Sequence, residues 1–226
     1  MSTNTTSVWR KKLKELEIVV VIPTYNNGKT LAAVIEEVCR YADDIIVVND
    51  GSTDDTANIL EQYPAIRTIT HPVNKGKGTA LKHGLSQAKK EGFRYAITID
   101  SDGQHFASDI PCFIEAIEKE PDTLLVGARN LASDNMPGKN TFANKFSNFW
   151  FRLETGLKLE DTQSGYRLYP LRKMDVQSCW YTAKYEFELE AIVFAAWGDV
   201  VVKNIPIHVY YPRSEERRVG KECRSR

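Results

Sequence analysis

Two carboxylates one residue apart, in the stretch Asp100-Ser101-Asp102-Gly103-Gln104, are the side chains of this sequence best suited to chemistry. They follow the apolar run Tyr95 to Ile99, which is typical of a buried strand. Because alternate residues of a strand face the same side, Asp100 and Asp102 can converge on one Mg²⁺ or Mn²⁺ ion, and Gln104 adds a neutral oxygen ligand. A solvated Asp-Ser-Asp-Gly turn is the alternative, and it is favoured if these five residues are considered alone.

The loops after two earlier apolar runs carry side chains suited to a nucleoside. In Pro23-Thr24-Tyr25-Asn26-Asn27 the ring of Tyr25 can stack on a base, and the amides can bond base or ribose edges. In Asn49 to Asp54, Gly51 permits close approach, Thr53 or Asp54 can cap the next helix, and Asp50 is left as an acceptor. An ordinary polar turn explains the first loop equally well, whereas a pure capping loop would not need Asp50.

Two further segments are suited to anions. The glycine-rich stretch Asn74 to Ala80 leads into a helix, and Lys77 and Gly78 at the positive helix end suit a phosphate, although such loops are common. The stretch Asp161 to Arg167 combines a carboxylate, a hydroxyl and a guanidinium that can hold an acceptor. Arg129 is a second candidate anion clamp. A surface ion pair is the usual role of a single arginine.

Strands and helices alternate along the chain, which predicts a mostly parallel sheet with helices on both faces. Beyond Arg129 a polar loop interrupts this rhythm. The expected strands are Ile18–Ile22, Ile45–Val48, Ile66–Thr70, Tyr95–Ile99, Thr123–Val126, Gly165–Tyr169 and Val200–Ile205. The expected helices are Gly28–Arg40, Asp54–Tyr63, Gly78–Lys90, Asp109–Lys119, Phe142–Leu153 and Lys184–Ala196.

Length and composition favour one α/β domain. The chain has 226 residues, and its 30 Lys and Arg balance its 30 Asp and Glu, so no overall field attracts nucleic acid. Four separated cysteines argue against a disulfide scaffold or a zinc site and favour a reducing, cytoplasmic setting. Residues 1–16 are expected to be a flexible segment, residues 17–212 the domain, and residues 213–226 an atypical charged tail outside the fold.

The aromatic segment Phe142 to Leu153 spaces apolar residues by three and four, with Phe146, Phe149 and Trp150 on the same face. Such a face can contact a lipid or a membrane surface. Packing into the core is the alternative, and it is favoured for most of these residues.

Taken together, the motifs resemble those of the family 2 glycosyltransferases of the GT-A fold, especially the branch of dolichol-phosphate mannosyltransferase and related polyprenyl-phosphate glycosyltransferases. The resemblance covers Ile18 to about Tyr211, and six motifs in the right order make it highly specific. Asn27 stands where the family motif has Glu. The matching segments are Pro23–Asn27, Asn49–Asp54, Asn74–Ala80, Asp100–His105, Gly127–Arg129 and Ser164–Arg167.

The resemblance implies a Rossmann-like, three-layer α/β/α sandwich and an inverting, metal-dependent transfer of a sugar from a GDP- or UDP-sugar. It implies a cation on Asp100, Asp102 and Gln104, and an acceptor, a polyprenyl or dolichyl phosphate, that contacts Arg129, Gln163, Ser164 and Arg167. The other residues that are expected to bind the nucleotide sugar are Pro23, Thr24, Tyr25, Asn27, Asp50, Gly51, Lys77, Gly78 and Ser101. A peripheral position at the cytoplasmic membrane face follows from a lipid acceptor.

Other readings stay open from the sequence. If the acceptor is a hydroxyl of a growing glycan, Asp161 is the nearest candidate for a general base, although a structural role for it is at least as good. The chain could instead be an inactive nucleotide-sugar-binding domain. A nucleotidyltransferase shares the layout, but the sequence lacks a glycine-rich signature near its N-terminus for a triphosphate.

Overall fold

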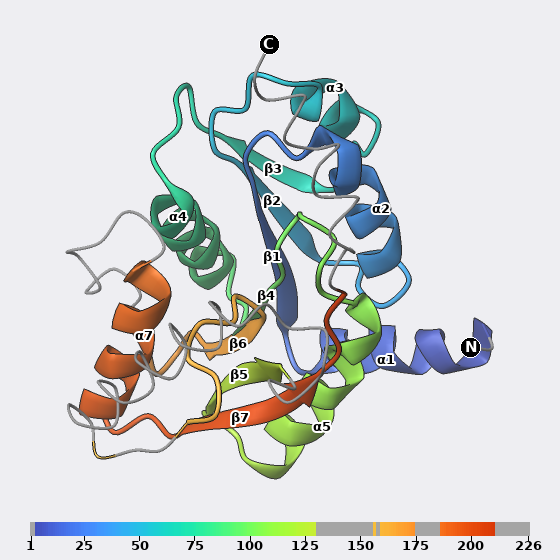
Figure 1. Ribbon diagram of the computed structural model, residues 1–226. Helices are drawn as coiled ribbons and strands as arrows, with labels where there is room; N and C mark the ends of the chain where they lie inside the picture. Colours follow the sequence, from blue (N-terminus) through green and yellow to red (C-terminus); the bar gives the residue numbers. More distant parts are fainter. Residues whose placement is uncertain (1–2, 130–155, 157–158, 175–185, 211–226) are drawn as a thin grey trace.

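The computed structural model describes residues 3–129, 156, 159–174 and 186–210 of the chain. In this part of the chain seven strands form one sheet in the order β3-β2-β1-β4-β6-β5-β7 (Figure 1). β6 is antiparallel to both its neighbours, and the other pairings are parallel. The strands are β1 (Ile18–Thr24), β2 (Ile45–Asn49), β3 (Arg67–Thr70), β4 (Tyr95–Thr98), β5 (Leu124–Arg129), β6 (Arg167–Pro170) and β7 (Val202–Ile207).

Helices cover both faces of the sheet, which confirms the expected three layers (Figure 1). Val20 and Ile22 of β1 pack on one side, while Val19 and Val21 pack on the other, as the twofold period of a strand requires. The first side carries α1 (Thr3–Glu15), α2 (Gly28–Val38), α3 (Thr56–Glu61) and α5 (Ile110–Lys119), which the short 3₁₀ turn η1 (Ala107–Asp109) precedes. The second side carries α4 (Lys77–Lys90) and α7 (Glu186–Trp197).

Burial follows the position of each strand in the sheet. All residues of β1, β2 and β4 are buried, because a strand between two layers of helices must be apolar on both faces. β3 lies at one edge and exposes Arg67, Thr68 and Thr70. The continuous apolar runs of the sequence therefore mark the centre of the sheet.

The strand order reverses at β1, and this reversal positions the polar loops. The chain places β2 on one side of β1 and β4 on the other, and all three strands are parallel. The loops that follow them carry Tyr25, Asp50 and Asp100, and they therefore lie together at the carboxyl ends of these strands. Ligands of open α/β sheets bind at such a switch point.

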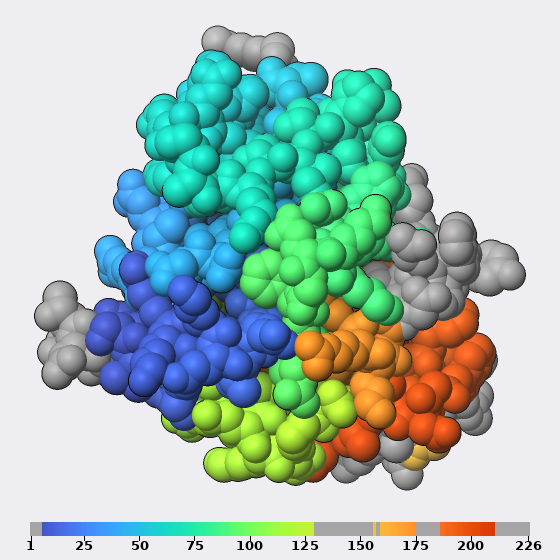
Figure 2. Space-filling view, turned by 180° about the vertical axis from the view of Figure 1, so that it is seen from behind, coloured from blue at the N-terminus to red at the C-terminus, as the bar shows by residue number. Residues whose placement is uncertain are grey.

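The N-terminal segment differs from the expectation. Residues 3–15 form α1, and Leu13 is only 2 % exposed, so a flexible segment is wrong for this part of the chain. Arg10 lies 3.0 Å from Asp43, and Lys12 lies 2.6 Å from Glu118 of α5. Figure 2 shows α1 (dark blue) between the segments that carry these two acids.

Some element boundaries also shift. β1 continues through Pro23 to Thr24, with Pro23 opposite Val48, and β5 continues to Arg129. The helix expected over Phe142–Leu153 and the tail 213–226 lie outside the described residues. The domain limits 17–212 therefore stay a prediction. Among the described residues, no helix is both long enough and apolar enough to cross a membrane.

Candidate active site at the strand ends

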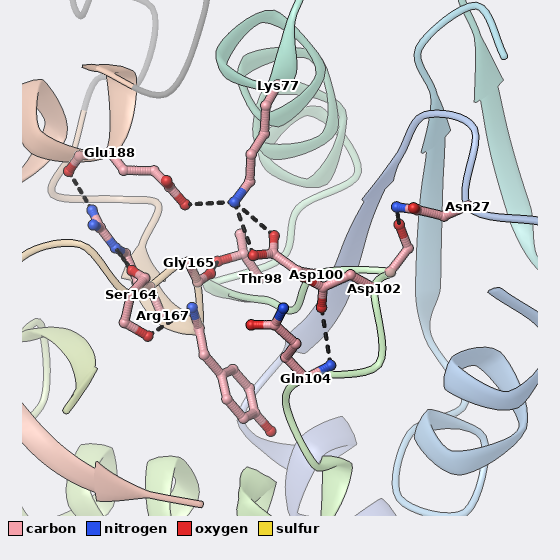
Figure 3. Close-up of polar contacts among 12 residues, drawn as sticks. Asn27, Lys77, Thr98, Asp100, Asp102, Gln104, Ser164, Gly165, Arg167 and Glu188 are labelled. Atoms are coloured by element: carbon pink, nitrogen blue, oxygen red, sulfur yellow. Dashed lines mark hydrogen bonds and ion pairs between the residues drawn. The ribbon is translucent and has the colours of Figure 1, made fainter. Parts of the chain in front are cut away.

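The turn after β4 is fixed through Ser101, the residue between the two carboxylates. The Asn27 amide donates to the Ser101 hydroxyl at 2.8 Å, and the Thr30 hydroxyl donates to the Ser101 carbonyl at 2.6 Å. Asp102 accepts the backbone N–H of Gln104 at 3.0 Å, and both side chains reach the surface (Figure 3). Asn27 and Ser101, which were expected to bind the nucleotide sugar, thus bond each other and hold the Asp100–Asp102 turn.

Asp100 has a lysine partner inside the protein. The Lys77 ammonium, at the start of α4, lies 2.7 Å from Asp100 and 3.1 Å from Glu188 of α7 (Figure 3). Burial opposes the charge on both partners, yet the ion pairs raise the pKa of Lys77 and lower the pKa of Asp100. We call Lys77, Asp100 and Glu188 the Asp100 cluster. Lys77 was expected to meet a phosphate, and here it forms ion pairs with two carboxylates.

The three side chains of the Asp100 cluster pack against Gly165. A Cβ atom at this position would lie 2.7 Å from Glu188, 2.8 Å from Asp100 and 2.8 Å from Lys77. The Gly165 carbonyl accepts the Thr98 hydroxyl at 2.7 Å, which holds the backbone in place (Figure 3). The cluster therefore packs directly on the backbone of Gly165, where any side chain would push the three charged groups apart.

The oxygens near Asp102 fit a hard cation that shares its coordination with a ligand. Partial burial and the charge of Asp100 raise the pKa of Asp102, so the two carboxylates stand close enough to repel each other. No group of three His, Cys, Asp or Glu side chains in the described residues is arranged to hold a metal by itself. Mg²⁺ typically binds to one or two carboxylates and completes its shell with substrate phosphates.

Asp50 has a different environment. The residue is 2 % exposed, and its carboxylate accepts His71 Nδ1–H at 2.6 Å, the Lys75 N–H at 2.9 Å and the Gly76 N–H at 2.8 Å. Since a carboxylate only accepts, Nδ1 of His71 carries the proton, and Nε2 lies 2.7 Å from Nδ1 of His83. We call Asp50, His71, His83 and the backbone of Lys75 and Gly76 the Asp50 network.

The Asp50 network changes the interpretation of the glycine-rich loop. The glycine-rich loop was expected to suit a phosphate, but its Lys75 and Gly76 N–H groups bond Asp50. Gly51, at φ 69°, permits a close approach as expected, but to the chain itself: a Cβ there would lie 2.4 Å from the Val73 carbonyl carbon. A nucleoside contact of Asp50 and Gly51 stays a prediction.

The loop after β1 is tied to the loop after β2. Asp54 accepts the Gly28 N–H at 2.9 Å and the Thr56 N–H at 3.1 Å, so it serves the first residues of α2 and α3. Pro23 and Thr24 are buried, and the Tyr25 ring is 45 % exposed. Gly78 is buried within α4. Of these expected nucleotide-binding residues, Tyr25 is the one whose side chain is open to a ligand.

Arg167 is not an anion clamp, and this expectation is wrong. Its side chain is completely buried, and its guanidinium donates to the carbonyls of Ser164 at 2.7 Å and Glu188 (Figure 3). It also donates to the Thr162 carbonyl at 3.0 Å. All three nitrogens thus bond the backbone. Arg167 ties the loop before β6 to the first turn of α7 and so positions Glu188.

The remaining acceptor-side residues are mostly structural. Asp161 is fully buried and accepts the Gln163 N–H at 2.9 Å, which argues against its role as a general base. The Ser164 side chain is also buried, and Gln163 is exposed. Arg129 ends β5, and its side chain lies outside the described residues.

Four side chains that bond the loops or carboxylates at the strand ends were not predicted from the sequence. They are Glu188, His71, His83 and Asn204. Asn204 of β7 donates to the carbonyls of Asp161 at 3.0 Å and Val126 at 3.1 Å. Glu188 had a signal, because a buried acid on an apolar helix needs a partner. The two histidines lie 12 residues apart in a loop and a helix, and no local pattern marks them as a pair.

Comparisons with known proteins agree with this geometry. The chain is 31 % identical over 215 residues to the UDP-N-acetylglucosamine--dolichyl-phosphate N-acetylglucosaminyltransferase of Methanococcus voltae, covering 86 % of each chain. It is 27 % identical over 201 residues to the polyprenol monophosphomannose synthase of Mycolicibacterium smegmatis, covering 83 % of this chain and 75 % of the relative.

Among solved structures, the fold is similar to that of glucosyl-3-phosphoglycerate synthase from Mycobacterium tuberculosis, in a complex with Mn²⁺, uridine diphosphate and glucosyl-3-phosphoglycerate. The TM-score is 0.67 at 19 % identity, covering 97 % of this chain and 80 % of that one, which confirms the fold. The profile of Glycosyl transferase family 2 matches residues 19–176. The chain therefore belongs to glycosyl transferase family 2 and is a glycosyltransferase.

Proposed function

We propose that this glycosyltransferase moves a sugar from a GDP- or UDP-sugar to a polyprenyl or dolichyl phosphate, with inversion at the sugar and with Mg²⁺ or Mn²⁺. The observation that carries the proposal is the pair Asp100 and Asp102 at the carboxyl end of β4, beside the loops of β1 and β2. Two relatives are named for dolichyl-phosphate or polyprenol substrates, which supports this acceptor class.

On the donor side, Tyr25 offers an exposed ring to the base, and Asp102 and Gln104 present oxygens at the surface. A divalent cation bound there with Asp100 would offset the negative charge that develops on the leaving diphosphate. The Asn27–Ser101 and Thr30–Ser101 hydrogen bonds keep the turn in one conformation. The chain's own contribution is therefore a preorganised set of oxygen ligands.

On the acceptor side, a lipid phosphate needs no general base. It is already anionic and needs positioning more than deprotonation. The buried state of Asp161 agrees with this, because its bonded carboxylate is not exposed to a substrate. Arg129, at the end of β5, is the candidate to position the phosphate. A lipid acceptor also places the reaction at a membrane surface, and we propose its cytoplasmic face.

The test is metal-dependent release of nucleoside diphosphate from UDP-N-acetylglucosamine, UDP-glucose and GDP-mannose, with and without dolichyl phosphate and Mn²⁺. We expect release to require the lipid, and Asp102→Ala to lower turnover by about 100-fold or more. Asp43→Ala is the matched control, since this carboxylate is 63 % exposed at the opposite end of β2, and we expect unchanged turnover.

Two outcomes would overturn the proposal. Turnover with a sugar hydroxyl acceptor but not with the lipid phosphate would show another glycosyltransferase reaction. Binding of the donor without turnover by any acceptor would show a nucleotide-sugar-binding domain.

A further inference from the structure

The Asp100 cluster places an ammonium group where the proposed function needs a divalent cation. Lys77 lies 2.7 Å from Asp100 Oδ1 and 2.9 Å from Oδ2, so it contacts both oxygens of a proposed metal ligand. A cation that binds Asp100 must therefore share this carboxylate with Lys77 or displace the lysine from it. Two positive groups at one carboxylate repel each other, and in a partly buried site this repulsion is weakly screened.

Glu188 provides a second position for the lysine. The residue is 6 % exposed, its carboxylate lies 3.1 Å from Lys77, and Arg167 donates to its backbone carbonyl. Lys77 thus keeps one ionic partner if its contact with Asp100 is lost. A short movement of the flexible lysine side chain is enough to break that contact. All three groups lie against Gly165, because a Cβ atom there would come within 2.8 Å of each of them, so the two acids are close neighbours of the same ammonium.

From these contacts, and on the basis of the proposed function, we infer that Lys77 is an exchangeable counter-ion of the cation site. Lys77 and the divalent cation compete for Asp100, and Glu188 retains the lysine when the cation is bound. Lys77 is thus a positioning residue that sets the affinity for the metal.

This exchange has a consequence for the order of binding. The metal alone must displace a lysine from Asp100, whereas a metal that arrives with the diphosphate of the donor brings additional ligands. We therefore expect the metal to bind weakly by itself and to bind tightly together with the nucleotide. The complete cation site would then form only when the donor binds.

The test is direct Mn²⁺ binding to the full chain without nucleotide, measured by the electron paramagnetic resonance signal of free Mn²⁺. The decisive variant is the double substitution Lys77→Met with Glu188→Gln, which removes one positive and one negative charge. Exchange predicts that it binds Mn²⁺ about tenfold more tightly than the wild type, because Asp100 loses its competitor. An effect of net charge alone predicts no change.

The double variant also limits the effect on folding, because it leaves only Asp100 without its lysine, whereas Lys77→Met alone leaves both Asp100 and Glu188 uncompensated. Lys75→Met is the matched control. It removes a lysine from the same loop whose backbone N–H, rather than its ammonium, bonds a carboxylate. We expect less than about a twofold change in Mn²⁺ affinity from this exposed charge.

Equal Mn²⁺ affinity of the wild type and the double variant would overturn the inference, and so would a failure of both to bind Mn²⁺. The proposed function is tested separately by sugar transfer. A wild type that transfers the sugar with Mn²⁺, together with unchanged affinity of the double variant, would reject the exchange and leave the function intact.

Discussion

Asp50 and Asp100 each stand just beyond a buried strand beside β1, yet the protein uses them differently. In the Asp50 network three donors of the chain hold the carboxylate, two of them backbone N–H groups that cannot move without the loop. In the Asp100 cluster the donor is the end of a flexible lysine, and the exposed Asp102 lies next to it. A fixed set of donors suits Asp50 to a structural role, whereas a movable partner leaves Asp100 available to the proposed cation.

Removal of the Asp50 carboxylate tests the scaffold side and has the largest expected effect on stability. Asp50→Ala leaves the buried His71 Nδ1–H and two partly buried backbone N–H groups without their acceptor. We expect the free energy of unfolding to fall by about 3–5 kcal/mol. Urea unfolding measures it, with the exposed Asp55→Ala as control. A loss below about 1 kcal/mol would show that the Asp50 network does not hold this loop.

A methyl group at Gly165 tests the site side. The atoms that it would meet are the ends of the Lys77, Asp100 and Glu188 side chains, which can move apart without breaking the backbone. We therefore expect Gly165→Ala to cost about 1–2 kcal/mol of stability and to lower sugar transfer about tenfold.

Gly84→Ala is the control for this substitution. Its methyl would meet Val21 in the core at 2.5 Å, away from the cluster. It should lower stability by about 1–3 kcal/mol and leave the turnover of the folded protein unchanged. If the two alanine variants lose turnover equally, the Asp100 cluster has no special role.

The smallest effect is expected at His83. Burial, followed by the neighbouring His71 and Lys75, lowers the pKa of His83 from its ordinary value of 6.5. The unfolded chain then binds more protons near this pH, so the stability contribution is present above pH 6.5 and is lost as pH falls through the lower folded pKa.

Because His83 is exposed, its pH-dependent contribution should not exceed about 0.5 kcal/mol. His83→Gln should flatten the dependence of urea-unfolding stability on pH between about 5 and 7. An unchanged slope would assign the effect to another group.

The sequence predicts a feature well when the interacting residues lie close together along the chain. Apolar runs predicted β1, β2 and β4 because a strand buried on both faces requires them. The Asp-Ser-Asp turn was found because both carboxylates lie in one loop. Arg167 was misread because its three acceptors are backbone carbonyls, which no side-chain motif reveals.

Contacts across the fold were beyond the sequence for the same reason. Glu188 and Lys77 belong to α7 and α4, and only the packing of these helices on the same face of the sheet brings them together. The α1 helix was missed because its polar composition hides the few apolar residues, such as Leu13, that anchor it in the core.

If the turn with Asp100 and Asp102 holds the cation together with the donor diphosphate, as we propose, the two ligands together should stabilise the folded protein. Thermal unfolding of the wild type and Asp102→Ala would be compared with and without Mn²⁺ plus UDP or GDP. At about 100 times the dissociation constant the wild type should gain about 2.7 kcal/mol, or about 5–10 °C in Tm, with one nucleotide. The variant should gain almost nothing. An equal shift in both proteins, or none in the wild type with either nucleotide, would contradict the claim.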